Sequence, residues 1–171
     1  MDEIRTFEDA FRDGLASIYD TELQFLDARR SMLERAFDPA LKRMIRDQMG
    51  QAEEQIGNLE QAFATLGRAT NRIRCEAATG LVGALEAGMG RASGVSELID
   101  CVIAQTLGKI EHHAVCTYRG LAAAAELMDE PSLAELLGRN LDQGEVALQK
   151  AETAINRLLR TAFHARDREH A

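Results

Sequence analysis

Two glutamates, Glu22 and Glu111, are the residues of this chain whose type and position are best suited to chemistry. Each stands among apolar residues at the three- and four-residue spacing of a helix, so each side chain is expected to face a protein interior. An ionised carboxylate in that place is costly unless a cation or a hydrogen-bond donor meets it. Two kinds of site would meet it: a metal ion bound between helices, or a layer of hydrogen-bonded polar side chains.

A metal centre would draw its ligands from five residues: Glu22, Glu111, His112, Glu54 and Glu145. Di-metal centres in helical bundles commonly use several carboxylates and two histidines, with a histidine three residues after a glutamate on one helix face. The sequence contains no Glu-x-x-His. Other positions expected to face the interior hold neutral residues instead: Gln48, Gln51, Gln105 and Gly144. We therefore expect no cofactor, and keep iron or another divalent metal as the alternative.

A hydrogen-bonded polar layer is the interpretation that the residues favour. The carboxylates would then accept hydrogen bonds or take up a proton as burial raises their pKa. The expected donors are Gln48, Gln51, Gln105 and His112. His113 projects about 100° away from His112 on a helix, so only one of the two can face the centre. No nucleophile motif, phosphate-binding glycine loop or Cys–His spacing stands out. The sequence predicts no catalytic residues, which favours a protein that is not an enzyme over one that is.

The composition excludes several classes of protein. Apolar residues make up 46% of the chain and charged residues 28%, in 171 residues with two prolines and no tryptophan, which is typical of one helical domain. The net charge of −8 argues against nucleic-acid binding. Charged residues interrupt every apolar run, so no membrane span is expected. The acidic start MDEIRTFED does not resemble a secretory signal, and we expect a cytoplasmic location. The odd number of widely spaced cysteines indicates reduced thiols rather than disulfides.

Turn signals divide the chain, taken as one domain over residues 1–171, into long helical segments. We expect helices over 6–37, 38–66, 76–89, 95–128 and 131–162, and a flexible tail over 163–171. Asp38-Pro39 and Asp129-Glu130-Pro131 each make a short link, so the flanking helices are expected to be antiparallel neighbours. The long middle connection lets the second pair of helices cross over. The predicted fold is all-α, a ferritin-like four-helix bundle with a short extra helix in the crossover.

Several motifs resemble the ferritin-like bacterial stress proteins of the YciF type, and together they cover nearly the whole chain. They are DGLASIYDTELQF, EEQIGNLEQAFATLG, CEAATGLVGALEA, KIEHHAVCTYRGLAAAAELM and NLDQGEVALQKAETAIN. The most specific matches are Tyr19-x-x-Glu22 and the segment from Glu111 to Tyr118. The resemblance implies a cytoplasmic, stress-associated bundle that forms a homodimer and whose biochemical activity is poorly defined.

Departures from the family pattern fall at the metal-binding positions. The family usually has His-Leu-Glu-Glu-Thr where this chain has Gln48–Ala52, and Glu-His-Tyr-Glu where it has Glu111–Ala114. A Glu-Glu pair is usual where this chain has Gln143 and Gly144. Glu22 and Glu111 thus match the pattern, while three helices have lost ligands. The resemblance, like the residue pattern, implies a degenerate di-iron site.

Three functions follow from these observations. The first is a non-catalytic structural or interaction protein, a homodimer with an unidentified protein partner and with no nucleic-acid or membrane binding. The second is an altered metal-binding protein that uses one or two ions for metal or oxidant handling. The third is a bundle that binds a small molecule in a centre left open by Gly108, Ala114 and Gly144.

Overall fold

The structure is a computed structural model that describes residues 3–92 and 94–169. All regular elements in this part of the chain are helices: α1 (Phe7–Arg35), α2 (Pro39–Thr65), α3 (Glu76–Arg91), α4 (Ser96–Leu127) and α5 (Pro131–Glu169). The first four lie within a few residues of the predicted ranges. The last continues to Glu169, past residue 162, so a helix replaces most of the predicted flexible tail, and residues 170–171 of that tail lie outside the described residues.

Local chemistry fixes the starts of the first two helices. Thr6 and Asp9 form a capping box in which the Asp9 N–H donates to Thr6 Oγ1 at 3.0 Å and the Thr6 N–H to Asp9 Oδ2 at 3.1 Å. Asp38 caps α2 by accepting from the Leu41 N–H at 2.7 Å, with Pro39 at the first helical position. The helix boundaries therefore follow from side chains that satisfy backbone N–H groups.

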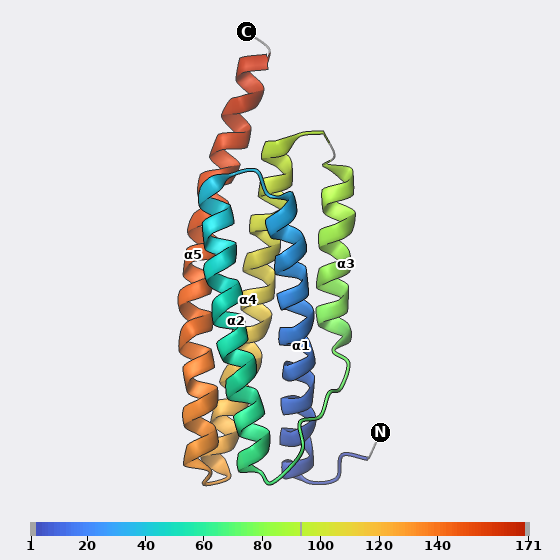
Figure 1. The fold of residues 1–171 in the computed structure, drawn as a ribbon, viewed down its shortest axis with the longest axis vertical. Helices are drawn as coiled ribbons and strands as arrows, with labels where there is room; N and C mark the ends of the chain where they lie inside the picture. The colour runs from blue at the N-terminus through green and yellow to red at the C-terminus, as the bar shows by residue number, and fades with distance from the viewer. Residues whose placement is uncertain (1–2, 93, 170–171) are drawn as a thin grey trace.

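Four long helices form the bundle, and α3 packs on its outside against α4 and α1 (Figure 1). Around the bundle the order of contacts is α1–α2–α5–α4, and each neighbouring pair runs antiparallel. The end of α5 projects beyond the other helices. The predicted all-α bundle with a helix in its crossover is confirmed. None of the described helices has the length and apolar character needed to cross a bilayer.

The turn between α1 and α2 is fastened from the other half of the chain. Asp100 of α4 accepts from the Phe37 and Asp38 N–H groups, both at 2.8 Å. Arg157 of α5 donates to both carboxylate oxygens of Asp38, at 2.9 and 2.7 Å. Burial raises the pKa of Asp100, while hydrogen bonds from Arg157 lower the pKa of Asp38. The turn between α1 and α2 is therefore bonded to both α4 and α5.

The crossover is fastened to α1 by the buried Asp20. Its Oδ2 accepts from the Cys75 N–H at 2.7 Å, and its Oδ1 accepts from Arg72 Nε at 2.5 Å. Burial opposes ionisation of Asp20, but these hydrogen bonds outweigh it and lower its pKa. The connection thus follows a fixed path along α1 before α3 begins.

The apolar core consists of two clusters, one toward each end of the bundle. On α1, Ile18 belongs to one cluster and Phe25 to the other, and on α4 Ala114 and Ile110 divide in the same way. Buried polar residues lie between the clusters or close to their boundary: Glu22, Arg29, Gln48, Gln55, Glu111 and Asn140. The middle of the bundle therefore contains a polar layer that separates two apolar regions.

Candidate functional site

The centre of the polar layer is an ion pair between Arg29 of α1 and Glu111 of α4. Arg29 Nη2 donates to Glu111 Oε1 at 2.6 Å, and the two side chains are only 3% and 4% exposed. Burial opposes the charge of Arg29, but attraction to Glu111 and Glu22 outweighs it and raises the pKa of the guanidinium. Arg29 is therefore a permanent internal cation at the middle of the bundle.

Glu22 lies beside this pair and shares its cation. Tyr118 Oη donates to Glu22 Oε1 at 2.8 Å, which again joins α1 to α4. The pKa of Glu22 is raised to about 7, mainly by burial and also by the negative charge of Glu111, while Arg29 and the hydrogen bond from Tyr118 act in the opposite direction. One guanidinium faces two carboxylates, so the layer becomes neutral when Glu22 holds a proton. Burial, with Glu22, also raises the pKa of Tyr118.

The opposite side of the layer is a clasp of amides between α2 and α5. Asn140, which is fully buried, donates from Nδ2 to the Gln55 carbonyl at 3.1 Å and accepts at Oδ1 from Asn58 Nδ2 at 2.7 Å. Gln55 Nε2 donates in return to the Asn140 carbonyl at 3.4 Å. These groups are neutral, and each pairs across the helix interface. The clasp therefore positions α2 on α5 without a charge.

The structure brings together only two of the five predicted ligands, Glu22 and Glu111. The other three are exposed and have partners on the surface. His112 faces Glu152 at 3.4 Å, Glu145 accepts from Arg119 at 2.6 Å, and Glu54 accepts from Gln143 at 3.1 Å. These contacts lie on outward faces of α2, α4 and α5, away from the buried pair.

The predicted donors also differ from those found. Gln105 and His112 are exposed, and Arg29 and Tyr118 bond the two carboxylates in their place. The expectation that glutamines or His112 satisfy these carboxylates was therefore wrong. The polar layer itself is present, and its main donor is a cation.

The residues at the centre do not fit a metal ion. Among the described residues no group of three or more His, Cys, Asp and Glu side chains is arranged to hold one. The guanidinium of Arg29 already binds Glu111, and a divalent cation between the carboxylates would lie against a like charge. Two observations thus argue against a metal centre: Arg29 occupies the position beside the carboxylates, and the three other predicted ligands face outward.

The glycines at the centre leave no open space of the kind predicted for a small molecule. A Cβ on Gly108 would lie 3.0 Å from Ile155 Cδ1, and one on Gly144 would lie 3.1 Å from Val115 Cγ2. Both glycines therefore allow α4 and α5 to pack closely. Neighbouring side chains occupy the space that the sequence suggested was open.

With this geometry established, a family model described as a domain of unknown function (DUF892) matches residues 6–163. This chain belongs to that family. Protein YciF of Escherichia coli strain K12 is 22% identical over 161 residues, which cover 93% of this chain and 96% of YciF. The resemblance to the YciF type is thus confirmed.

Two solved structures have the same bundle as this DUF892 protein. YcfI from Rhodopseudomonas palustris is 28% identical, with a TM-score of 0.86, covering 88% of this chain and 96% of its own. The crystal structure of the E. coli stress protein YciF is 21% identical, also with a TM-score of 0.86, covering 92% and 99%. The fold of this chain is therefore that of known YciF-like helical bundles.

Arg29 is the main residue that sequence reasoning missed in this DUF892 protein. It stands seven residues after Glu22 and four after Phe25, which places all three on one face of α1. A basic residue in an apolar register next to a predicted buried glutamate was therefore a readable signal for an internal ion pair. Asn140 carried a similar signal between Leu137 and Leu141.

A second arrangement that the sequence did not indicate joins Cys75 to His113. The thiol Sγ lies 3.8 Å from His113 Nε2 and 3.5 Å from the Ala78 N–H at the start of α3. The His113 ring also contacts Phe25 edge-on, and burial lowers the pKa of His113. These residues are far apart in sequence, and only the path of the crossover brings them together.

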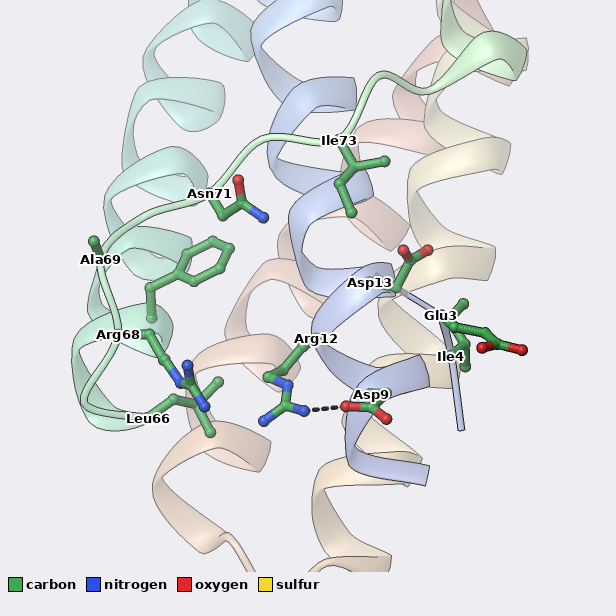
Figure 2. A pocket seen from close by; sticks show the side chains of 11 residues that line it. Glu3, Ile4, Asp9, Arg12, Asp13, Leu66, Arg68, Ala69, Asn71 and Ile73 are labelled. Atoms are coloured by element: carbon green, nitrogen blue, oxygen red, sulfur yellow. Dashed lines mark hydrogen bonds and ion pairs between the residues drawn. The ribbon is translucent and has the colours of Figure 1, made fainter. Parts of the chain in front are cut away.

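Two hollows, each of about 750 Å³, lie away from the centre, toward opposite ends of the bundle. The first, shown in Figure 2, lies between the start of α1, the end of α2 and the segment that follows. Arg12 points to Asp9 there and pairs with it, and the other charged groups on its wall are Glu3, Asp13 and Arg68. The second hollow is more apolar and lies between α3, α4 and the end of α5. Neither contains a convergent set of nucleophiles or metal ligands.

Proposed function

We propose that this chain is a non-catalytic, stress-associated bundle protein that acts as a structural or interaction protein. The observation that carries the proposal is the buried Arg29–Glu111 pair, which supplies an internal cation at the level where a metal centre would lie. A guanidinium cannot change oxidation state or exchange ligands, so this centre supports stability rather than metal or oxidant chemistry. The proposal includes a cytoplasmic location.

The relatives support the biological part of this proposal. YciF of E. coli is described as a stress protein, and YcfI of R. palustris is described, provisionally, as a structural protein. Neither description specifies a reaction. A role through protein contacts agrees with both descriptions.

We further propose that the contacts include a second copy of this chain. Exposed apolar side chains lie on both sides of the second hollow. Val95, just before α4, and Leu98 of α4 lie on one side, and Leu159 and Phe163 of α5 lie on the other. The same end of the molecule thus carries an apolar hollow and a projecting helix with an apolar face, which two copies could exchange about a twofold axis. Sedimentation equilibrium of the wild type and of Phe163→Glu tests this, since a dimer should dissociate in the variant. A monomeric wild type would contradict it.

The absence of a metal function is tested by elemental analysis of protein purified without chelator. We expect iron, manganese and zinc each to stay well below one ion per chain, and addition of each ion to leave the thermal midpoint unchanged. The matched variants are Glu22→Gln/Glu111→Gln at the centre and Glu54→Gln/Glu145→Gln on the surface. Stoichiometric metal that is lost only in the central variant would refute the proposed function.

A further inference from the structure

The polar layer contains buried atoms that no described group satisfies. Glu22 Oε2, Arg29 Nε and Nη1, and both amide atoms of Gln48 are buried without a hydrogen-bond partner. Glu22, Arg29 and Gln48 are at most 3% exposed. Buried donors and acceptors are nearly always paired with protein groups or ordered water, because an unpaired group loses its hydration without compensation. So many unpaired atoms in one layer indicate that something else bonds to them.

These atoms lie near one level of the bundle. Tyr19 Oη of α1 donates to Glu60 Oε1 of α2 at 3.0 Å, which places these two residues at about the same level of the bundle. The two helices are antiparallel, so the same number of residues from Tyr19 along α1 and from Glu60 along α2, both toward the turn, leads to Arg29 and to residue 50. Residue 50 lies between the buried Gln48 and Ala52. Glu22 lies two turns along α1 from Arg29 and is close enough to share its charge. Gln48 therefore lies at about the level of Arg29, and Glu22 lies beside the same charged pair.

The charges of this layer select a neutral guest. Arg29 cancels Glu111, and Glu22 becomes neutral when it holds a proton. An additional cation would lie against the guanidinium, and an anion would lie against two carboxylates. The guest must also donate to Gln48 Oε1 and accept from Arg29 and Gln48 Nε2, and at Glu22 Oε2 it must donate to the ionised carboxylate or accept from the protonated one. Water is the smallest molecule that does both.

We propose that the centre of the bundle is a binding site for a small cluster of ordered water molecules held by Arg29, Gln48 and Glu22. About two waters, each making about three hydrogen bonds, would satisfy the unpaired atoms of these residues. This inference extends the proposed function, because it assigns a guest to a layer that is proposed to hold no metal.

A crystal structure of the wild type at near-atomic resolution, with oxygen-17 relaxation dispersion of water in solution, tests the inference. We expect discrete density within hydrogen-bonding distance of Arg29 Nη1 and Glu22 Oε2, and long-lived waters in solution. Gln48→Met, which keeps the length of the side chain and removes both amide atoms, should lose part of that slow-water signal. Gln61→Met changes an exposed glutamine of the same helix and should not.

Two results would overturn the water site, and they differ in what they say of the proposed function. A dry centre, in which the Gln48 amide turns onto Arg29 or Glu22, would remove the water site and leave the non-metal function intact. Density with the coordination of a metal would refute both. The wild-type structure decides between these outcomes even if Gln48→Met does not fold.

Discussion

The two sides of the polar layer solve the same packing problem with different chemistry. Between α1 and α4 the buried groups are charged: Arg29 bonds Glu111 while Tyr118 bonds Glu22. Between α2 and α5 they are neutral amides, centred on Asn140. Both sides join antiparallel neighbours, but only the charged side depends on pH and on the presence of every partner. The comparison shows that one bundle can join one pair of neighbouring helices through buried charges and the other pair through neutral hydrogen bonds.

The largest effect is expected when the internal cation is removed. Arg29→Met leaves Glu111 buried without its partner, and breaking a buried pair in this way costs about 3–5 kcal/mol of unfolding free energy. Urea unfolding at neutral pH, followed by circular dichroism, measures the loss. A change of less than about 1 kcal/mol would mean that the pair is hydrated or exposed in solution.

Removing both partners separates the strength of the pair from the penalty of an unpaired charge. Arg29→Met/Glu111→Leu replaces the pair by apolar side chains, and such exchanges are often neutral or stabilising. We therefore expect the double variant to recover most of the stability lost in Arg29→Met. A double variant as unstable as the single one would show that the pair also fixes the packing of α1 on α4.

The next effect concerns the proton on Glu22. Because its folded pKa, about 7, lies above the ordinary glutamate value of 4.5, its contribution to stability is fully present below about pH 4.5 and is lost as the pH rises through 7. Glu22→Gln imitates the protonated form and keeps an acceptor for Tyr118. The variant should equal the wild type near pH 4.5 and exceed it by up to about 3 kcal/mol at pH 8.

Unfolding free energies of both proteins across this pH range give the test, since shifts of other groups cancel in the difference. Glu145→Gln, which changes an exposed carboxylate paired with Arg119, is the matched control and should show no such trend. A difference between Glu22→Gln and wild type that does not grow with pH would contradict the raised pKa.

The smallest effect is expected in the amide clasp. Asn140→Ala removes the side chain that bonds Gln55 and Asn58, and the loss of buried neutral hydrogen bonds costs about 1–2 kcal/mol. No charge changes, so this loss should be the same at pH 5 and pH 8. A loss that varies with pH would show that the clasp is coupled to the protonation of Glu22.

Most of the fold could be predicted because its signals are local. Asp38-Pro39 starts α2 through a cap and a preset backbone angle, and apolar spacing identifies each inward face. The end of α5 was less predictable, because no proline or glycine stops the helix after residue 162. Local patterns therefore determined the starts of the helices better than the last end.

The site was predictable only in part. The buried positions of Glu22 and Glu111 followed from periodicity, and Arg29 lay in the same register. Whether that arginine faces the centre or lies along the surface depends on the rotation of α1 against α4, which one helix does not specify. The approach of Cys75 to His113 depends on how the crossover is held to Asp20, and no spacing along the chain encodes that path.

The fastened turn between α1 and α2 has a consequence for synthesis of the chain. Its Phe37 and Asp38 N–H groups bond to Asp100, and the Asp38 carboxylate bonds to Arg157. When the last residue of α2 is added to the growing chain, neither Asp100 nor Arg157 has been translated. The turn between α1 and α2 therefore lacks its hydrogen-bond partners until α5 has been synthesised. The order of translation thus separates the formation of the first helices from the closure of the bundle.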